Sequence, residues 1–475
     1  VKQSKDFASG DSSSDLEPSL DVYYKITPSL TAALTLNTDF SATEVDDRQV
    51  NLTRFSLFLP EKRQFFNQDL DIFSFGGLEE NGRPFFSRRI GLSDGGEPVD
   101  IIAGGKVSGR IGRWNIGVLD VLQDDSANVP RTNVFVGRAA ANILEESSLG
   151  LIYTNGNPTA DIDNQLFGVD FRYRNTSLIA GNTIQGVAWY QRSDTEGIES
   201  DQEAYGWRVE YPNSERWFGE LGQWVIEENF NPAVGFVNRA DIIGTKAEIG
   251  YTFTPNGRFL RNITFKNIFE NIDNTDGELE SRELVIEPFS VETQFGDEFE
   301  IRLKRIDEVL EEEFEISPGV IIGTGAYSFD RVQFVLESAL ERRLALGLDI
   351  DIGDFYDGDL FKVGGNVSWR PGRHFYMQLG YEYNDVELPA GSFVTRLYRL
   401  RADVAFTDKW SWLNVVQYDN VTDTGGFNSR LRYNPQAGQD LYLVLNRQFD
   451  VDPLTRDVSS STSEFVVKFN YTFRF

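Results

Sequence analysis

The chain has 475 residues, no cysteine and one histidine, and its 74 acidic residues outnumber its 45 basic residues to give a formal net charge of −29. This charge excludes a nucleic-acid-binding protein, which needs a basic surface. Without cysteine there are no disulfides, thiolate metal sites or covalently attached haem, and no apolar run approaches the roughly 18 residues that a membrane-spanning helix needs.

Residues 1–18 are rich in Ser, Asp, Gly and Lys and show no periodicity, which predicts a flexible N-terminal lead-in. The sequence begins at Val1 without an initiator Met or a charged-then-apolar leader. We therefore expect either that a signal peptide has been removed or that the chain is part of a longer protein. Candidate strands follow at 19–26, 30–40 and 49–58.

From residue 19 onward the main signal is an alternation of apolar and polar residues. Because successive side chains of a strand point to opposite faces, each such segment predicts a strand with one apolar, largely aromatic face and one polar face. The clearest segments are 30–40, 167–174, 205–211, 243–253, 344–352, 375–384, 398–406 and 465–475.

The alternating runs are about 9–12 residues long, which is the length that a tilted strand needs to cross a bilayer, whereas soluble strands usually have about 5–6 residues. Any one run would also fit a soluble sandwich. Full charges in mid-strand favour a membrane barrel, whose apolar face meets lipid and whose charged face lines a wet lumen. The presence of both positive and negative residues on this face suits either a hydrated channel or an interior filled by its own salt bridges. The predicted lumen-facing charges are Asp170, Arg172, Arg174, Glu300, Arg302, Lys304, Arg399, Arg401 and Asp403.

The connections between strands alternate in length. Short ones with Gly, Pro, Asn or Asp, such as 254–257 and 370–373, alternate with longer acidic ones, such as 193–203 and 450–462. This asymmetry is typical of periplasmic turns and outer loops. The fold class is therefore all-β: one large antiparallel transmembrane barrel over 19–475, with about 24 strands in a range of 22–26. Because lipid offers the backbone no partners, the first and last strands must pair.

Residues 59–98 break the alternation and contain paired Phe and paired Arg residues, which argue against disorder. A long insert without regular structure is usually functional or disordered. It either folds into the lumen as a plug or constriction, or forms an ordered cap outside the barrel. The constriction candidates are Lys62, Arg63, Phe65, Phe66, Phe85, Phe86, Arg88 and Arg89.

Three runs in this region, Asn51–Phe55, Leu59–Phe66 and Phe86–Gly91, resemble an uncharacterised bacterial outer-membrane family. Its barrel of unknown function is found C-terminal to carbohydrate-binding family-nine-like domains. The resemblance implies an outer-membrane location and a sugar-binding-like domain upstream, and it suggests saccharides or other polar solutes as cargo. It implies no activity, because the family has none established.

Acidic residues far outnumber basic ones between Glu270 and Glu315, and a second acidic cluster follows. Oxygen-rich clusters suit hard cations such as Ca²⁺, although the spacing matches no dedicated loop. The alternative is a solvated acidic rim that meets the divalent ions bridging lipopolysaccharide. No other cofactor is expected. The candidate cation-binding residues are Asp349, Asp351, Asp354, Asp357 and Asp359.

The C-terminal residues Tyr471, Phe473 and Phe475 resemble the terminal aromatic signal that the barrel-assembly machinery reads; the alternative is an ordinary strand end. The lone histidine, His374, directly follows a turn and has no Ser or Asp motif beside it. Barrel enzymes commonly use a histidine as general base. Because the one histidine here lacks such partners, we expect no enzymatic activity.

The leading functional hypothesis is an outer-membrane channel, or the membrane-embedded part of a transport system, for polar solutes. The first alternative is a structural barrel that sheathes or anchors a partner protein in its lumen, in the periplasm or outside the cell. The second is a soluble carbohydrate-binding β protein, which would need no detergent.

Overall fold

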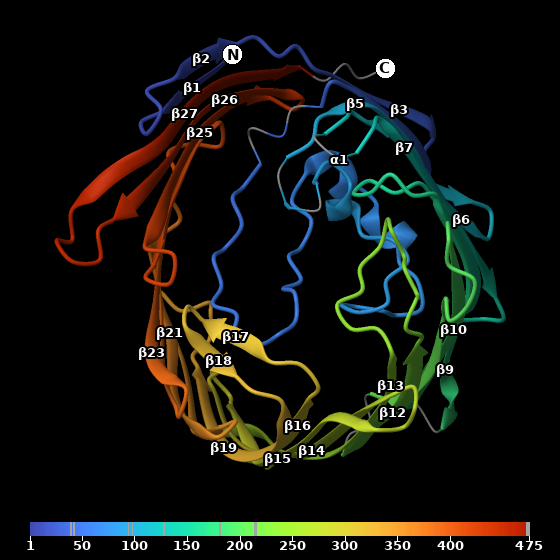
Figure 1. Cartoon of the computed structure of the whole chain (residues 1–475). Helices are drawn as coiled ribbons and strands as arrows, with labels where there is room; N and C mark the ends of the chain where they lie inside the picture. Colours follow the sequence, from blue (N-terminus) through green and yellow to red (C-terminus); the bar gives the residue numbers. More distant parts are fainter. Residues whose placement is uncertain are drawn as a thin grey trace.

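The computed structural model describes the whole chain except residues 39, 41, 42, 94, 97, 127, 128, 180, 181, 213–215 and 472–475. Its main element is a sheet of 25 strands in which all pairings are antiparallel, and β17 and β18 form a separate hairpin. Figure 1 shows the sheet curled into a ring, with both chain ends on the same arc. No helix in the described part of the chain is long and apolar enough to cross a bilayer.

The elements follow in chain order. The first third comprises β1 (Lys2–Asp6), β2 (Ser12–Asp15), β3 (Leu20–Thr27), β4 (Leu30–Leu36), α1 (Gln64–Asn67), the 3-10 helices η1 (Leu70–Phe73) and η2 (Ser87–Arg89), β5 (Ile101–Ile111), β6 (Trp114–Gln123), β7 (Thr132–Ile143) and β8 (Ser147–Asn155). The middle comprises β9 (Asn164–Ile179), β10 (Asn182–Thr195), β11 (Glu203–Tyr211), β12 (Trp217–Ile226), β13 (Ile242–Phe253), β14 (Leu260–Asn274), β15 (Leu279–Thr293), β16 (Glu298–Leu310), β17 (Phe314–Ser317) and β18 (Val320–Ile322). The last third comprises β19 (Gly325–Glu337), β20 (Leu344–Phe355), β21 (Gly358–Gly372), β22 (Phe375–Leu388), β23 (Gly391–Ala405), β24 (Trp410–Asp419), β25 (Thr424–Gln436), β26 (Gln439–Val451) and β27 (Val458–Tyr471).

The ring closes at a seam between the two ends of the chain. β1 pairs with β27, from Lys2 opposite Val466 to Asp6 opposite Thr462, and β2 pairs with β1. The first and last strands therefore pair as predicted. Because every pairing from β3 round to β27 is antiparallel, β2 and β3 run in the same direction, separated only by residues 16–19. Taken as one interrupted strand, they reduce the 25 strands to the predicted 24.

Two expectations for the N-terminal region are wrong. The lead-in 1–18 contains β1 and β2, whose Ser, Lys and Asp residues give no apolar alternation although their backbones pair in the sheet. The segment 49–58 is not a strand. It alternates like one, but it lies inside the ring, where no neighbouring strand pairs with it (Figure 1).

The two faces of the wall differ as the alternation predicts. Apolar side chains on the outer face remain open to the surroundings, for example Leu379 at 48% and Phe469 at 64% exposure. On the inner face Lys304 pairs with Asp351, and Arg401 pairs with Asp403 and approaches Glu44 of the inserted segment. Apolar groups thus face outwards and charges face the lumen.

The connection 37–100 between β4 and β5 leaves the wall and fills part of the ring, where α1 lies inside the strands (Figure 1). We call residues 64–92 the foot and residues 43–63 the bar. The foot packs a buried apolar cluster against strands β5 to β14; its members Phe65, Phe66, Phe73, Phe75 and Phe85 are 3–5% exposed. The hairpin β17–β18 also folds inwards, over a second cluster that includes Phe329 and Val386.

Candidate functional site

The foot sits where the wall strands carry glycine on their inner face. A Cβ atom at Gly117 of β6 would lie 2.8 Å from Cζ of Phe73, and one at Gly168 of β9 would lie 2.8 Å from Cζ of Phe75. Neither distance leaves room for a side chain. The wall is therefore thinned by glycine where the phenylalanine rings of the foot approach it.

Polar groups of the inner wall bind the backbone of the foot. Lys106 of β5 donates through Nζ to the carbonyl oxygen of Phe65 at 2.5 Å. Arg138 and Asp170 form a buried ion pair at 2.6 Å, and the same carboxylate accepts a hydrogen bond from the Gly76 amide at 3.2 Å. These contacts satisfy carbonyl and amide groups that the foot, lacking long helices, cannot satisfy itself.

Arg63 and Glu61 connect the bar to the foot. The Arg63 guanidinium donates to both carboxylate oxygens of Glu61, at 2.9 and 2.7 Å, and to the carbonyl oxygens of Ser87 and Ile90, each at 2.6 Å. Burial alone would raise the pKa of the Glu61 carboxyl, but the hydrogen bonds and charge of Arg63, with the Ser87 hydroxyl, hold that pKa below its usual value.

The first limb of the bar, residues 43–50, docks on strands β23–β25 through polar contacts. The Gln417 side chain accepts a hydrogen bond from the Arg48 amide at 2.7 Å and donates one to the Asp46 carbonyl oxygen at 2.9 Å. The Arg48 guanidinium pairs with Asp419 and donates to the Thr424 hydroxyl at 2.7 Å. Glu44 pairs with Arg430 at 2.6 Å.

The tip of the bar is the motif Asn51–Phe55, and it reaches the opposite wall. The Asn51 side chain closes the turn by accepting hydrogen bonds from the amide and hydroxyl of Thr53 and donating to the Phe55 carbonyl oxygen. Arg54 approaches Glu280 of β15 at 3.9 Å and Glu308 of β16 at 3.8 Å. The bar therefore spans the lumen from β23–β25 to β15–β16, in agreement with the path of the chain in Figure 1.

The constriction candidates lie together inside the ring, but most of them hold the insert in place. The four phenylalanines Phe65, Phe66, Phe85 and Phe86 are buried. Lys62 and Arg88 converge on Asp46, at 3.7 and 2.6 Å, and thereby tie the limbs of the bar to the foot. Arg89 ends η2.

All nine predicted lumen-facing charges form ion pairs. Asp170 binds Arg138 and Arg172; Arg174 lies 4.0 Å from Glu146; Arg302 binds Glu300 and Glu287; Lys304 binds Asp351; Arg399 lies 4.0 Å from Glu382; and Arg401 binds Asp403. Pairing of this density leaves these parts of the inner wall close to locally neutral.

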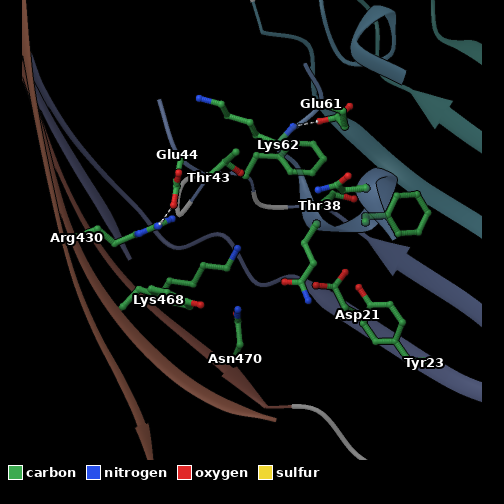
Figure 2. A pocket seen from close by; sticks show the side chains of 15 residues that line it. Asp21, Tyr23, Thr38, Thr43, Glu44, Glu61, Lys62, Arg430, Lys468 and Asn470 are labelled. Atoms are coloured by element: carbon green, nitrogen blue, oxygen red, sulfur yellow. Dashed lines mark hydrogen bonds and ion pairs between the residues drawn. The ribbon is translucent and has the colours of Figure 1, made fainter. Parts of the chain in front are cut away.

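Four cavities lie in a row between the insert and the arc of the wall that comprises β21–β27, β1 and β3. Cavity A, of about 510 Å³, lies beside the connection 420–423, and it shares Arg48 with cavity B, of about 670 Å³. Cavity B shares Val45, Val415 and Asn428 with cavity C, of about 330 Å³. Cavity C shares Glu44 and Lys62 with cavity D, of about 380 Å³, which reaches Lys468 and Asn470 near the end of β27 (Figure 2).

This row runs from one end of the barrel to the other. Cavity A lies at the end that carries the connection 37–100 and the other long loops, whereas the last residues of β27 point to the end that carries turns such as 112–113 and 373–374. Most residues that line cavities B, C and D are polar or charged, with Val45, Val415 and Phe427 among those of cavity B. Cavity A also has an apolar part, lined by Val50, Leu52, Ile316, Phe393 and Val421.

The remaining predicted sites lie elsewhere. Asp349 accepts a hydrogen bond from Gln333 at 2.8 Å, and Asp351 is held by Lys304 and Arg331. Asp354 and Asp359 are opposite each other across the β20–β21 hairpin, and Asp357 lies in its turn. Within the described ranges no three acidic or histidine side chains are grouped so that they could hold a metal ion. His374 contacts the Ala405 carbonyl oxygen at 2.7 Å. Tyr471 ends β27, and Phe473 and Phe475 lie outside the described residues.

Residues 2–409 match the family described as Domain of unknown function (DUF5916). The chain belongs to this family. The resemblance of the motifs to a barrel family of unknown function is thus confirmed at this level. A stretch of 127 residues is 25% identical to one component of the Na⁺-translocating NADH-quinone reductase of Vibrio vulnificus strain YJ016, and equally to that of strain CMCP6; it covers 25% of this chain and 46% of that component. The chain therefore spans about half the length of the curated relatives it matches.

Among solved structures, a mutant of the ferric enterobactin receptor PfeA of Pseudomonas aeruginosa matches with a TM-score of 0.49 and 10% identity, over 82% of this chain and 81% of the receptor. The siderophore receptor PirA of the same organism matches with a TM-score of 0.49 and 9% identity, over 81% and 79%.

Several residues that build the site of this DUF5916 chain were not expected from sequence. Glu44, Asp46 and Arg48 precede the predicted insert 59–98, and their partners Gln417, Asp419 and Arg430 lie at unremarkable strand positions. The one available signal was the acidic and basic run Glu44–Arg48 immediately before the Asn51–Phe55 motif, which is unusual for an outward apolar strand.

Proposed function

We propose that this chain is an integral barrel of the bacterial outer membrane that conducts polar solutes through the row of cavities A–D. The outward apolar faces suit acyl chains, and the wall strands from β5 onward, which have 9–16 residues, are long enough to cross the hydrocarbon core when tilted. The inward charges suit water.

The observation that carries the proposal is that each cavity shares lining residues with the next, from cavity A at the long-loop end of the barrel to cavity D near the end with the short turns. Volumes of about 330–670 Å³ accommodate small solutes rather than folded proteins. The mostly polar residues that line cavities C and D favour hydrated cargo. Saccharides are our preferred class, and that choice rests on the family's association with carbohydrate-binding domains.

The proposal includes the partners of such a barrel. Its outer face would contact lipid and lipopolysaccharide, and its C-terminal residues Tyr471, Phe473 and Phe475 would be read by the assembly machinery. A protein partner in the lumen is the alternative, but residues 37–100 already occupy much of that space.

Excision of the bar tests the channel. The limbs come together where Lys62 donates to the Val45 carbonyl oxygen at 2.7 Å, so a short Gly-Ser linker can replace residues 47–59 and leave Arg63, Glu61 and the foot in place. In planar bilayers we expect small conductance steps from the wild type and steps several times larger from the variant, because the bar crosses the lumen.

Three outcomes would contradict the proposed channel. Absence of conductance from both proteins would remove the channel function. Co-purification of a stoichiometric protein that stays bound in the lumen would instead favour the alternative function, a structural barrel that sheathes a partner protein. A protein that stays monodisperse without detergent would contradict membrane insertion altogether.

A further inference from the structure

Glu44 stands at the boundary between cavities C and D and lines both of them. Its carboxylate lies 2.6 Å from Nη2 of Arg430 on β25 and 4.0 Å from Nη1 of Arg401 on β23. Figure 2 shows Glu44 projecting from the bar towards Arg430, with Lys468 on the same side of the cavity. A carboxylate of the chain itself thus occupies an arginine pair within the proposed route.

The first limb is held on the wall by hydrogen bonds and ion pairs. Gln417, Asp419 and Thr424 hold the limb by hydrogen bonds and one ion pair, whereas the buried phenylalanines of the insert lie in the foot. Water and solutes compete effectively with such contacts, whereas the phenylalanines of the foot lose hydrophobic burial if they leave. The limb is therefore the part of the insert that can exchange its partners.

We propose that Arg430 and Arg401 form a binding site for the carboxylate of a passing solute, and that Glu44 occupies this site when no solute is bound. This inference rests on the proposed channel function and names its solute class: small carboxylated polar compounds of the uronic-acid type. The solute's carboxylate replaces that of Glu44 on Arg430, and the Glu44 side chain, which is 40% exposed, is released to water. Arg401 keeps its ion pair with Asp403 throughout.

The chemistry of the site favours a carboxylate over a neutral or cationic group. Guanidinium groups match carboxylates in planar, charge-assisted hydrogen bonds, which a sugar hydroxyl reproduces only weakly. A cationic group cannot take the place of the Glu44 carboxylate on Arg430, because it would bring two positive charges together. Tyr23 and Tyr442 line cavity D, and tyrosine rings can pack against the apolar face of a sugar.

Equilibrium dialysis of the detergent-purified full chain tests the inference without requiring conductance. The probes are glucuronate, glucose and glucosamine, which differ mainly in charge. We expect binding of glucuronate, at least tenfold weaker binding of the other two, and about tenfold tighter glucuronate binding by Glu44→Gln, because its internal competitor is neutral.

Two arginine variants complete the test. Arg430→Met should weaken glucuronate binding about tenfold or more, whereas Arg261→Met should change it less than twofold, because Arg261 pairs with Glu292 on the neighbouring strand and lines none of the cavities A–D. Resistance of the folded barrel to SDS at room temperature verifies that each variant is folded.

Equal affinity for glucuronate and glucose, or no gain in the Glu44→Gln protein, would overturn the inference. The Glu44→Gln measurement decides the matter even if Arg430→Met fails to fold. Failure of the channel function shows separately, as absence of conductance in bilayers, while glucuronate binding could still be measured.

Discussion

Glu61 is the residue that joins the bar to the foot. Its side chain is 2% exposed, and it accepts hydrogen bonds from the Arg63 guanidinium, the Ser87 hydroxyl and the Lys62 and Arg63 amides. Removing the charge of one partner from a buried pair costs about 3 kcal/mol or more. Because the pKa of the folded state is lowered, this stabilisation is present above the ordinary glutamate pKa and is lost as the pH falls through the lowered value.

We therefore predict that Glu61→Gln lowers hydrogen-exchange protection of residues 61–92 at pH 7 by about 3 kcal/mol. The difference from the wild type should shrink as the pH falls below the ordinary glutamate pKa of about 4.3, and it should vanish once the pH passes the lowered value, where the folded wild-type carboxyl also becomes protonated. Hydrogen exchange read by mass spectrometry and corrected for intrinsic rates measures this. A difference that stays constant down to pH 3 would show that the charge of Glu61 is not what holds the foot.

At the scale of elements, the fit between the foot and the wall depends on small residues. We predict that Gly117→Val displaces η1, because its Cβ alone would lie 2.8 Å from Cζ of Phe73, and that the foot loses about 1–3 kcal/mol of stability. Gly105→Val on the neighbouring strand is the control, since nothing lies within 4 Å of a Cβ there. Protease cleavage within residues 64–92 should rise for Gly117→Val alone; equal cleavage of both variants would contradict the fit.

The elements also show what sequence can and cannot predict. Strands such as β20 and β23 were predictable, because lipid on one side and water on the other impose a period of two that is visible in each segment. The first limb was not, because its partners follow far along the chain: Gln417 is 369 positions from Arg48, and Arg430 is 386 positions from Glu44. The residue Val50 fits an outward strand position as well as it fits a segment inside the lumen.

The Asn51–Phe55 motif illustrates the same limit. The sequence drew attention to it through a family resemblance, yet its role in the structure is to turn the bar and bring Arg54 towards Glu280 and Glu308. A turn closed by asparagine is predictable locally. The opposing carboxylates are not, since they depend on the closure of the ring.

At the scale of the whole molecule, the insert is consistent with the width of the barrel. A sheet of this many strands encloses a lumen too wide for its own side chains to fill. The foot, the bar and the β17–β18 hairpin fill it from the end with the long loops, and they leave the row of cavities along β21–β27. The position of the foot therefore decides which arc of the wall lines the proposed route.

Adjacent residues on opposite faces of β21 test this arrangement. Val367 is exposed on the outer face, and Asn366 lines cavity C. We predict that Val367→Arg destabilises the barrel in lipid vesicles by about 2–4 kcal/mol, because the charge enters the hydrocarbon layer, whereas Asn366→Arg costs little, because it enters a wet lumen beside Glu44 and Asp47. Urea unfolding in vesicles compares the two. If Asn366→Arg proved the more destabilising, the outer face would be the wet one, and neither the barrel's insertion nor its inner route would stand.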